Sequence, residues 1–379
     1  MNILFIGHEK NLNGASISMI DIIKEMKKDN KIYVLIPYSE GAVYEELVKE
    51  EVEVVSATYY MWCDVRASKK NWFKKRFYWY LYEQLTNMFT AKKISKYVMK
   101  NNIDIIHTNT SVINLGGLIS KYTGKKHIWH IREFADADFN MYPLCNNRNY
   151  YKFMNKNADK FICVSQAVAS HYDKLDKNKK IVIHDGLNDG YGKVCKENTQ
   201  SDMDYCEYDA QVNILIAGRI CETKGQQLVV DACEKLIDEG VENFKLYLAG
   251  VEKEKLVIPE KLNGYVKKCG FVKDMVSLRA DMDIEIVPSK YEAYGRGTAE
   301  AMAAGNPVIG RNTGGTKELI THKENGLLFN DLEELTLCMS ALICDKELRQ
   351  KLGQNAKDYA NKEFSIKKCV DKIYDVYKS

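Results

Sequence analysis

Short apolar runs alternate along the chain with longer segments in which apolar residues recur at helical spacing. Runs of four to seven apolar residues separated by helix-length segments are typical of parallel β-strands joined by helices. We expect buried strands at residues 3–6, 32–36, 52–56, 103–107, 127–130, 161–164 and 181–183, and again at 213–216, 245–249, 284–287 and 307–309. The pattern therefore predicts two series of β-α-β units.

A polar, acidic stretch without periodicity separates the two series and is predicted to be a linker at 190–210. We predict an α/β protein with two Rossmann-like, doubly wound domains, at 1–189 and 211–362, that face each other across a cleft. A C-terminal helix at 363–379 is expected to pack back on the first domain. Ligands are expected at the carboxyl ends of the strands, because doubly wound sheets bind them there.

Composition narrows the class of protein. With 45% hydrophobic and 28% charged residues and only 5 prolines, the chain is typical of a globular protein rather than a disordered one. The formal net charge is only +3, which argues against a bulk nucleic-acid binder. The 11 cysteines form no Cys-x-x-Cys pair, so disulfides and a thiolate zinc site are not expected.

The first residues also bear on location. They resemble a strand rather than a secretory signal, and no apolar run approaches the ~20 residues that span a bilayer. We therefore expect a cytoplasmic protein whose contact with membranes, if any, is peripheral.

Two carboxylates frame a glycine-bearing loop in the second domain. Glu292 follows the predicted strand 284–287, Gly295 comes next, and Glu300 lies in the helical segment beyond it. Glycine lets a ligand approach the backbone closely, and a helix start supplies free N–H groups and a partial positive charge. This arrangement favours a diphosphate ligand, although either carboxylate alone is more often a solvated surface residue.

Further phosphate-binding groups follow two neighbouring strands. Gly314 and Gly315 follow the strand at 307–309 and are expected to add amide donors. Arg219 follows the strand at 213–216, and Lys224 comes five residues later. A guanidinium fork and an ammonium at a strand end can converge on phosphate oxygens. The alternative is that both are surface cations at the start of a helix.

The stretch from Glu292 to Glu300, Glu-Ala-Tyr-Gly-Arg-Gly-Thr-Ala-Glu, closely resembles the Glu-x7-Glu region of the retaining glycosyltransferases of family 4, which have the GT-B fold. The resemblance continues through the Thr-Gly-Gly-Thr-Lys-Glu sequence that ends at Glu318, and it covers nearly the whole chain. It implies a hexosyltransferase that moves a sugar from a nucleotide-sugar, expected to be a UDP-sugar, to a saccharide acceptor.

The same resemblance implies roles for individual residues. His130 takes the place of the family's active-site histidine, and Glu292 is expected to bind the hydroxyls of the donor sugar. The residues expected to bind the donor are Gly14, Arg219, Lys224, Tyr294, Gly295, Arg296, Glu300, Gly314 and Gly315, and those on the acceptor side are His107, Asn109, Arg132 and Glu133. Arg219 and Lys224 would hold the diphosphate and Glu300 the ribose. His107 ends a strand and is at least as often structural in that position.

Glycosyl transfer builds positive charge at the anomeric carbon and negative charge on the leaving diphosphate, so the catalyst stabilises charge at two ends. No nucleophile for a double displacement is evident, and the resemblance implies same-face attack with retention. Three Asp-x-Asp triplets, at 136–138, 202–204 and 281–283, match a metal-binding pattern, but so short a pattern recurs by chance. We expect no metal and no other cofactor.

A basic, aromatic segment at 64–90 carries a separate signal. On a helix, Trp72, Lys75, Arg76 and Trp79 share one face, opposite a predicted core face of Phe73, Phe77, Tyr80, Leu81, Gln84 and Met88. Indoles beside cations suit the surface of an anionic membrane. The alternative is a basic surface helix with loosely packed aromatics.

Together these observations favour a peripheral membrane glycosyltransferase that extends a lipid-linked saccharide in surface-polysaccharide biosynthesis. A nucleotide-sugar epimerase of similar fold and a non-catalytic nucleotide-sugar-binding protein are the alternatives. No nucleic-acid partner is expected.

Overall fold

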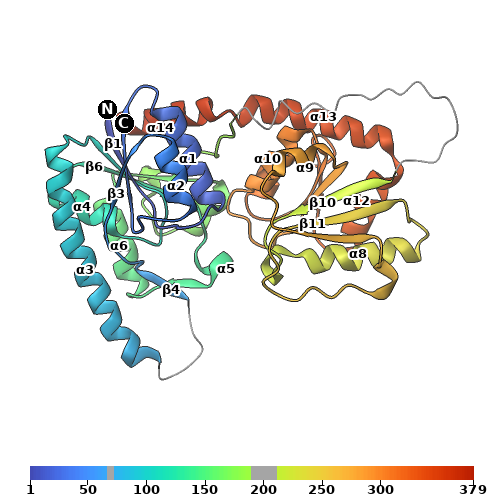
Figure 1. Cartoon of the computed structure of the whole chain (residues 1–379), viewed down its shortest axis with the longest axis horizontal. Helices are drawn as coiled ribbons and strands as arrows, with labels where there is room; N and C mark the ends of the chain where they lie inside the picture. Colours follow the sequence, from blue (N-terminus) through green and yellow to red (C-terminus); the bar gives the residue numbers. More distant parts are fainter. Residues whose placement is uncertain (66–71, 189–210) are drawn as a thin grey trace. The chain divides into compact units, whose positions relative to one another are not determined.

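The structure is a computed structural model that describes residues 1–65, 72–188 and 211–379, with only the backbone described at 72–77. The predicted linker at 190–210 therefore lies outside the described residues. The chain separates into two compact units, Met1–Gly186 with Ile366–Ser379, and Leu187–Ser365 (Figure 1).

The first unit contains a sheet of seven parallel strands in the order β3-β2-β1-β5-β6-β8-β9. The strands are β1 (Asn2–Ile6), β2 (Lys31–Ile36), β3 (Glu53–Ser56), β5 (Ile105–Thr108), β6 (Lys126–Ile131), β8 (Lys160–Cys163) and β9 (Lys180–Val182). A short antiparallel pair joins β4 (Cys63–Val65) to β7 (Met141–Pro143). The seven strands expected in this half of the chain are confirmed.

Helices cover both faces of this sheet. They are α1 (Gly14–Met26), α2 (Ala42–Lys49), α3 (Trp72–Lys100), α4 (Leu115–Thr123), α5 (Asp136–Phe139), α6 (Asn147–Asn157), α7 (Gln166–His171) and α14 (Ile366–Lys378). Alternate residues of β1 face opposite ways: Phe5 joins a core with α1 and α14, whereas Leu4 joins a core with α3 and α4. Burial on both faces explains why the strands are continuous apolar runs.

The second unit contains six parallel strands in the order β12-β11-β10-β13-β14-β15. The strands are β10 (Val212–Ala217), β11 (Phe244–Ala249), β12 (Val266–Gly270), β13 (Ile284–Val287), β14 (Val308–Arg311) and β15 (Leu327–Phe329). The helices are α8 (Gln226–Asp238), α9 (Met275–Ala280), α10 (Arg296–Ala304), α11 (Thr316–Leu319), α12 (Leu332–Cys344) and α13 (Lys346–Glu363). The predicted class, two doubly wound parallel α/β sheets, is confirmed.

In each sheet the strand order reverses beside the first strand, between β1 and β5 in the first unit and between β10 and β13 in the second. The loops that leave such neighbouring strands run in opposite directions and open a crevice at the carboxyl ends. Lys224 follows β10 and Glu292 follows β13, so both belong to the crevice of the second unit.

Helix α3 differs from the prediction in the face that it buries. Leu81 and Met88, expected in the core, are 42% and 41% exposed. The buried stripe consists instead of Glu83, Asn87, Ala91, Ile94 and Val98. Asn87 is accommodated because its amide donates to the Tyr60 carbonyl (2.9 Å) and to the Asn114 side chain (3.0 Å) and accepts from the Tyr60 N–H (2.8 Å). The predicted core face is therefore wrong at Leu81 and Met88.

The side chains of Trp72, Lys75 and Arg76, which the sequence places on a membrane face, lie outside the described residues. Trp79, from the same predicted face, is 60% exposed. No helix in the described ranges has both the length and the apolar character needed to cross a bilayer.

Candidate active site

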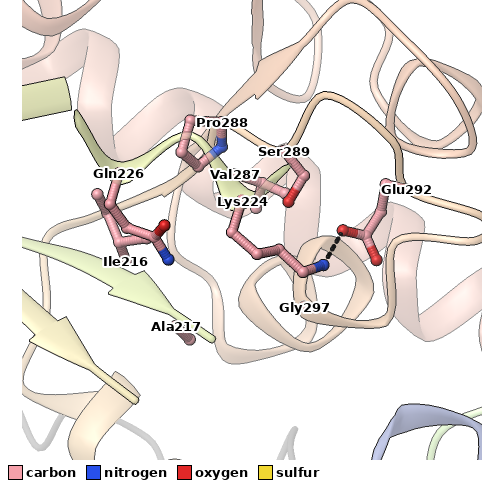
Figure 2. Close-up of a pocket in the computed structure, with 9 residues that line it drawn as sticks. All are labelled: Ile216, Ala217, Lys224, Gln226, Val287, Pro288, Ser289, Glu292 and Gly297. Carbon is pink, nitrogen blue, oxygen red and sulfur yellow. Dashed lines mark hydrogen bonds and ion pairs between the residues drawn. The ribbon is translucent and has the colours of Figure 1, made fainter. Parts of the chain in front are cut away.

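Lys224 and Glu292 meet in the crevice of the second unit, where the Lys224 ammonium donates to the Glu292 carboxylate over 2.7 Å (Figure 2). The cavity around them is lined by Ile216, Ala217, Lys224, Gln226, Val287, Pro288, Ser289, Glu292 and Gly297. Its volume is about 70 Å³, well below the ~300–1,000 Å³ of pockets for drug-sized ligands. The cavity therefore fits one polar group of a ligand, such as a phosphate, rather than a whole nucleotide-sugar.

The position of Lys224 depends on the glycine that follows it. Gly225 has a left-handed backbone (φ 74°), and a Cβ there would collide with the Pro288 carbonyl oxygen at the end of β13. The Lys290 N–H also donates to the Thr223 carbonyl over 3.0 Å. The loop after β10 is thus packed directly on the loop after β13, which brings the ammonium to the carboxylate.

Two further glycines position Glu292. A Cβ at Gly314 would collide with the Glu292 carbonyl oxygen, and the Gly315 N–H donates to that same oxygen over 2.7 Å. The Gly314-Gly315 loop therefore supports the Glu292 loop. The Gly315 N–H is engaged within the protein, and its contact with a donor stays a prediction.

The charge of Lys224 is preserved in this site. Burial tends to lower the pKa of Lys224, but the negative charge and the hydrogen bond of Glu292 outweigh burial and raise the pKa above its ordinary 10.5. The site thus presents a permanent cation beside a carboxylate. If this ion pair separates, the ammonium can contact a phosphate and the carboxylate can accept from sugar hydroxyls.

Glu300, at the other end of the Glu-x7-Glu stretch, is held by two arginines. Its carboxylate accepts from Arg279 over 2.7 Å and from Arg296 over 2.8 Å. Arg279 also pairs with Glu285 of β13 over 2.8 and 3.0 Å. Arg296, expected to bind the donor, therefore orients Glu300 in this structure, and the binding of ribose by Glu300 stays a prediction.

Neither Arg279 nor Glu285 was predicted from the sequence. In the structure each is only 1% exposed. A carboxylate within the apolar run of β13 was the available signal, because a buried charge needs a partner. Burial raises the pKa of Glu285 above its ordinary 4.5, and the Arg279 guanidinium opposes this shift.

Three other predicted donor residues, Arg219, Tyr294 and Gly295, do not line this cavity. Arg219 follows β10 with an exposed side chain and is not among the cavity-lining residues, although its charge lowers the pKa of Lys224 slightly. Tyr294 is buried, and Gly295 is the N-cap residue of α10. Their contacts with the donor stay predictions.

The predicted catalytic His130 lies together with the predicted acceptor-side residues in the first unit, at the ends of β5 and β6. The His107 and His130 rings are fully buried, and their Nε2 and Nδ1 atoms are 3.1 Å apart. Burial lowers the pKa of both well below 6.5, and the charge of Arg132 lowers it further. Both rings are therefore neutral at physiological pH.

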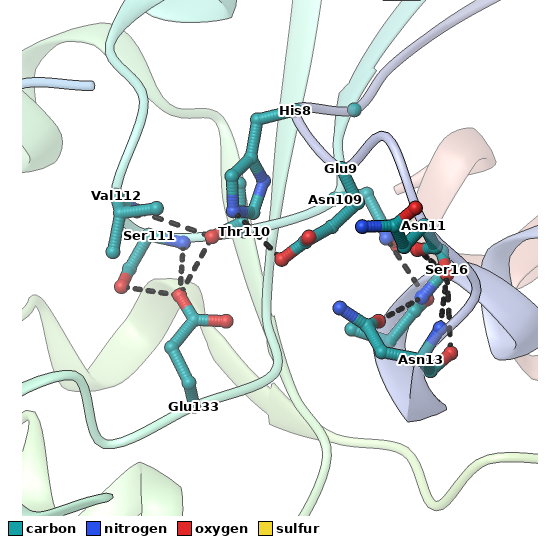
Figure 3. Close-up of polar contacts among 12 residues, drawn as sticks. His8, Glu9, Asn11, Asn13, Ser16, Asn109, Thr110, Ser111, Val112 and Glu133 are labelled. Carbon is teal, nitrogen blue, oxygen red and sulfur yellow. Dashed lines mark hydrogen bonds and ion pairs between the residues drawn. The ribbon is translucent and has the colours of Figure 1, made fainter. Parts of the chain in front are cut away.

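Arg132 and Glu133 both have polar partners inside the first unit. Arg132 forms a buried ion pair with Asp185 at 2.6 Å. Glu133 accepts from the Thr110 hydroxyl (2.8 Å) and from the N–H and hydroxyl of Ser111 (both 2.6 Å), as Figure 3 shows. These contacts order the loop after β5, and direct acceptor contact by either charge stays a prediction.

Gly14 lies at the exposed start of α1. Its neighbours Asn13 and Ser16 form a capping box, with bonds of 3.0 and 2.9 Å (Figure 3). The Asn109 amide donates to the Ala15 carbonyl over 3.1 Å, which ties this loop to the end of β5. The N–H groups at the start of α1 are thus ordered at the switch point of the first sheet.

The aspartate triplets have separate explanations. Asp136 and Asp138 lie in α5, and Asp283 accepts from the Asn213 N–H over 2.9 Å; the triplet at 202–204 lies outside the described residues. Among the side chains that the structure describes, no three His, Cys, Asp or Glu gather as a possible metal site.

Comparison with known proteins assigns the family. Residues 12–190 match the family described as Glycosyltransferase Family 4, and residues 211–345 match Glycosyl transferases group 1. An uncharacterized glycosyltransferase of Methanocaldococcus jannaschii is 30% identical over 316 residues, which are 77% of this chain and 80% of that protein. The chain is a group 1, family 4 glycosyltransferase.

Two further proteins resemble this glycosyltransferase. N-acetyl-alpha-D-glucosaminyl L-malate synthase of Bacillus anthracis is 24% identical, over 76% of this chain and 77% of that protein. The crystal structure of HepE from Anabaena in complex with UDP has a TM-score of 0.76 and 20% identity, with both chains fully covered. The predicted family, its GT-B fold and transfer from a nucleotide-sugar are confirmed, which favours the transferase over the epimerase and the non-catalytic binding protein.

One carboxylate of this glycosyltransferase titrates near neutrality. Burial raises the pKa of Asp138 from 3.8 to about 7, and the charge of Glu133 adds to the shift. Its Oδ1 atom is buried and has no hydrogen-bond partner among the described residues. Because the folded pKa is the higher one, this group contributes most to stability below pH 3.8, and the contribution is lost as the pH rises toward 7.

We therefore expect Asp138→Asn to stabilise the protein more at about pH 8 than at about pH 5.5. The difference between the two pH values is about 2 kcal/mol, because roughly 1.5 pH units of the shift lie between them. Chemical denaturation at both pH values measures it. Asp136→Asn, on the same short helix but paired with His171 at 2.8 Å, is the control. An equal change in stability at both pH values for Asp138→Asn contradicts the prediction.

Proposed function

We propose that this protein is a retaining glycosyltransferase that uses a UDP-sugar to extend a lipid-linked saccharide at an anionic membrane surface, in the assembly of a surface polysaccharide. The observation that carries the donor half of the proposal is the Lys224–Glu292 pair in the crevice between β10 and β13. Transfer from a nucleotide-sugar is the family activity, and the proposal adds the nucleotide, the stereochemistry and the acceptor.

The donor end is argued from charge. Departure of UDP leaves negative charge on the diphosphate, and Lys224 supplies an ammonium whose charge is permanent at physiological pH. The N-terminus of α10, which begins at Arg296, adds a partial positive charge nearby in the sequence. HepE, which shares this fold, has been solved with UDP and with UDP-glucose, and this supports a uridine diphosphate donor.

The sugar end is assigned to Glu292 and His130. When the diphosphate takes the Lys224 ammonium, the Glu292 carboxylate is released to accept from donor-sugar hydroxyls. His130 is neutral and provides a hydrogen bond to the same sugar. With no nucleophile proposed, the acceptor hydroxyl attacks the face that the diphosphate leaves, and the anomeric configuration is retained.

The test is product analysis with a panel of UDP-, GDP- and ADP-sugars. Each α-linked donor is incubated with the protein and lipid-linked saccharides, released nucleotide is quantified, and the anomer of the new bond is assigned by NMR. We expect UDP release with an α-linked product, unchanged by EDTA because Lys224 and helix N–H groups serve the diphosphate. A β-linked product refutes retention, turnover of GDP- or ADP-sugars alone refutes the donor, and loss of activity in EDTA refutes the metal-independent mechanism.

The acceptor half rests on α3. One face of this helix presents Tyr78, Trp79, Tyr82, Leu85 and Phe89, which are 73%, 60%, 53%, 53% and 69% exposed. We call these five residues the aromatic face. Exposed apolar residues gathered along about three turns of one helix mark an interaction surface. The exposed Lys92, Lys93 and Lys96 continue the helix beyond this face and add positive charge.

A membrane surface matches this chemistry better than a protein partner. Tryptophan and tyrosine favour the headgroup region of a bilayer, where an apolar ring meets a polar edge, and lysines nearby attract anionic lipid. An enzyme docked in this way meets its acceptor in two dimensions, which suits a saccharide carried on a lipid.

Replacing Trp79 and Phe89 together by serine is expected to weaken binding to vesicles that contain phosphatidylglycerol by about 10-fold or more, because two large apolar side chains no longer enter the interface. Sedimentation with vesicles measures the binding. Turnover of a soluble acceptor should stay within about twofold, because neither residue belongs to the proposed donor site.

The matched control is Leu337→Ser, which removes a 69% exposed apolar residue from α12 of the second unit. It should leave vesicle binding unchanged. Equal binding of the double variant and the unmodified protein, or equal binding to neutral and anionic vesicles, contradicts the membrane assignment.

A further inference from the structure

Three buried rings in the first unit form a continuous chain of contacts. The Tyr377 hydroxyl of α14 lies 2.6 Å from His107 Nδ1 on β5, and His107 Nε2 lies 3.1 Å from His130 Nδ1 on β6. Tyr377 is 4% exposed, and both histidines are fully buried. A residue of the last helix thus reaches the proposed active-site histidine through one intermediate.

The direction of these hydrogen bonds follows from Arg132. Its Nη2 lies 3.4 Å from His130 Nδ1, and a guanidinium can only donate. His130 Nδ1 therefore accepts, so His107 donates to it through Nε2–H. His107 Nδ1 is then unprotonated and accepts from the Tyr377 hydroxyl. Since His130 is neutral, its single ring proton lies on Nε2.

The surrounding contacts make this arrangement rigid. Arg132 Nη1 donates to both carboxylate oxygens of Asp185, at 2.6 and 2.7 Å, and its Nε donates to Asn109. The Lys126 ammonium donates to the Tyr377 carbonyl over 2.9 Å and so anchors the end of α14. His130 Nε2, in contrast, is buried and has no hydrogen-bond partner among the described residues.

We propose that His107 and Tyr377, together with Arg132, are positioning residues that hold His130 as its Nε2–H tautomer, so that this ring presents a neutral N–H donor to the donor sugar. The inference rests on the proposed role of His130 in transfer. Its physical basis is that the other ring nitrogen of a histidine sets the tautomer through the hydrogen bond that it makes. With the proton on Nδ1, Nε2 becomes an acceptor and can no longer donate to a sugar oxygen.

A buried N–H group without a partner is the second observation that points to a ligand. Buried polar atoms are nearly always paired, and an exception indicates a functional group or a missing partner. The chain of contacts also gives α14 a function beyond packing. Although it follows the whole second unit in sequence, this helix supplies the Tyr377 hydroxyl that begins the chain of hydrogen bonds to His107 and His130. We call this chain the relay.

The tautomer is measured directly by NMR of the full-length protein labelled with ¹⁵N-histidine. Of the seven histidines, His130 is assigned by the signals that disappear in His130→Gln. We expect an unprotonated Nδ1 and a protonated Nε2 in the unmodified protein. A protonated Nδ1 overturns the proposal, whatever the activity of the protein.

Variants then test the relay. His107→Leu removes the donor to His130, whereas His107→Gln keeps an amide N–H near the same position. We expect His107→Leu to populate the Nδ1–H tautomer of His130 and to lower kcat by about 10-fold, with the donor KM within about threefold. His107→Gln should recover most of the loss. Tyr377→Phe, which removes one oxygen atom, should shift the tautomer in the same direction with a smaller loss of kcat.

The outcomes separate this inference from the proposed function. An unshifted tautomer in both His107→Leu and Tyr377→Phe, or equal loss of kcat in the leucine and glutamine variants, overturns the relay. Unchanged transfer by His130→Gln instead refutes the proposed role of His130, and the ¹⁵N signals still decide the tautomer. If His107→Leu fails to fold in a thermal melt, Tyr377→Phe alone decides, because it leaves the packing of the ring in place.

Discussion

Lys224→Ala is expected to lower kcat for sugar transfer by about 10²-fold or more, the typical result of removing one group that stabilises developing charge. The ammonium pairs with Glu292 and is a partly buried cation at the crevice between β10 and β13. Its loss also leaves Glu292 without its partner, so the carboxylate repels the diphosphate that it formerly helped to receive. Steady-state kinetics with a UDP-sugar, together with calorimetric titration of UDP, measure both effects.

Lys290→Ala is the matched control for this experiment. Lys290 lies in the adjoining loop and pairs with Glu222 at 3.0 Å, but its side chain is exposed. Because exposed ion pairs contribute little, kcat should change by less than about threefold. Glu292→Gln provides a second comparison, since it should lower turnover while affecting UDP binding less than Lys224→Ala does. Equal kinetics for the Lys224 and Lys290 variants would show that Lys224 does not take part in the reaction.

Arg279→Met is expected to destabilise the second unit by about 3–5 kcal/mol, the range found when one member of a buried ion pair is removed. Arg279 lies between Glu285 and Glu300, so its loss leaves a buried carboxylate on β13 without a partner. Methionine keeps the length of the side chain, which limits the effect of lost packing. Urea denaturation followed by circular dichroism measures the change.

A double variant, Arg279→Met with Glu285→Gln, separates charge from packing. It should recover part of the lost stability, because the remaining strand residue is neutral. Lys261→Met, in which an exposed cation paired with Asp238 at 2.8 Å is lost from the same unit, should leave stability nearly unchanged, because exposed ion pairs contribute little. If the single and double variants are equally unstable, the buried charge is not the cause.

Arg279→Met should also weaken UDP binding if Glu300 contacts the ribose, because the carboxylate then loses a guanidinium contact that orients it. Since this effect depends on the proposed role of Glu300 and the loss of stability does not, the two measurements are independent. A variant that is unstable yet binds UDP normally below its melting temperature would place the ribose elsewhere.

The strands illustrate what could be read from the chain. Strands β1, β2 and β10 were predictable because parallel sheets bury both faces, which produces continuous apolar runs. Strand β12, at the edge of its sheet, contains Lys267 and Lys268 and was missed, because an edge strand need not be apolar. Strands β4, β7 and β15, of three residues each, were also missed.

Helix α3 shows where pattern reading fails. Helical spacing assigned Leu81 and Met88 to the core, but both are exposed and the buried stripe includes Asn87. Whether an apolar residue of a helix is buried depends on whether another element packs against that side of the helix. The hydrogen bonds of Asn87 to Tyr60 and Asn114 are tertiary contacts that no helical period contains.

The amino-acid sequence by itself indicated the α/β class through its spacing of apolar runs and the family through the resemblance of the Glu292–Glu300 stretch, and it placed Lys224 and Glu292 after predicted strands. Only the tertiary structure decided which charges neutralise one another and which ring nitrogen carries a proton. Arg279 pairs with Glu300, which is 21 residues away in the sequence, and His107 contacts Tyr377, which is 270 residues away. Such pairings depend on distances of about 3 Å between side chains brought together by folding, and hydrogen bonds are lost within a further ångström.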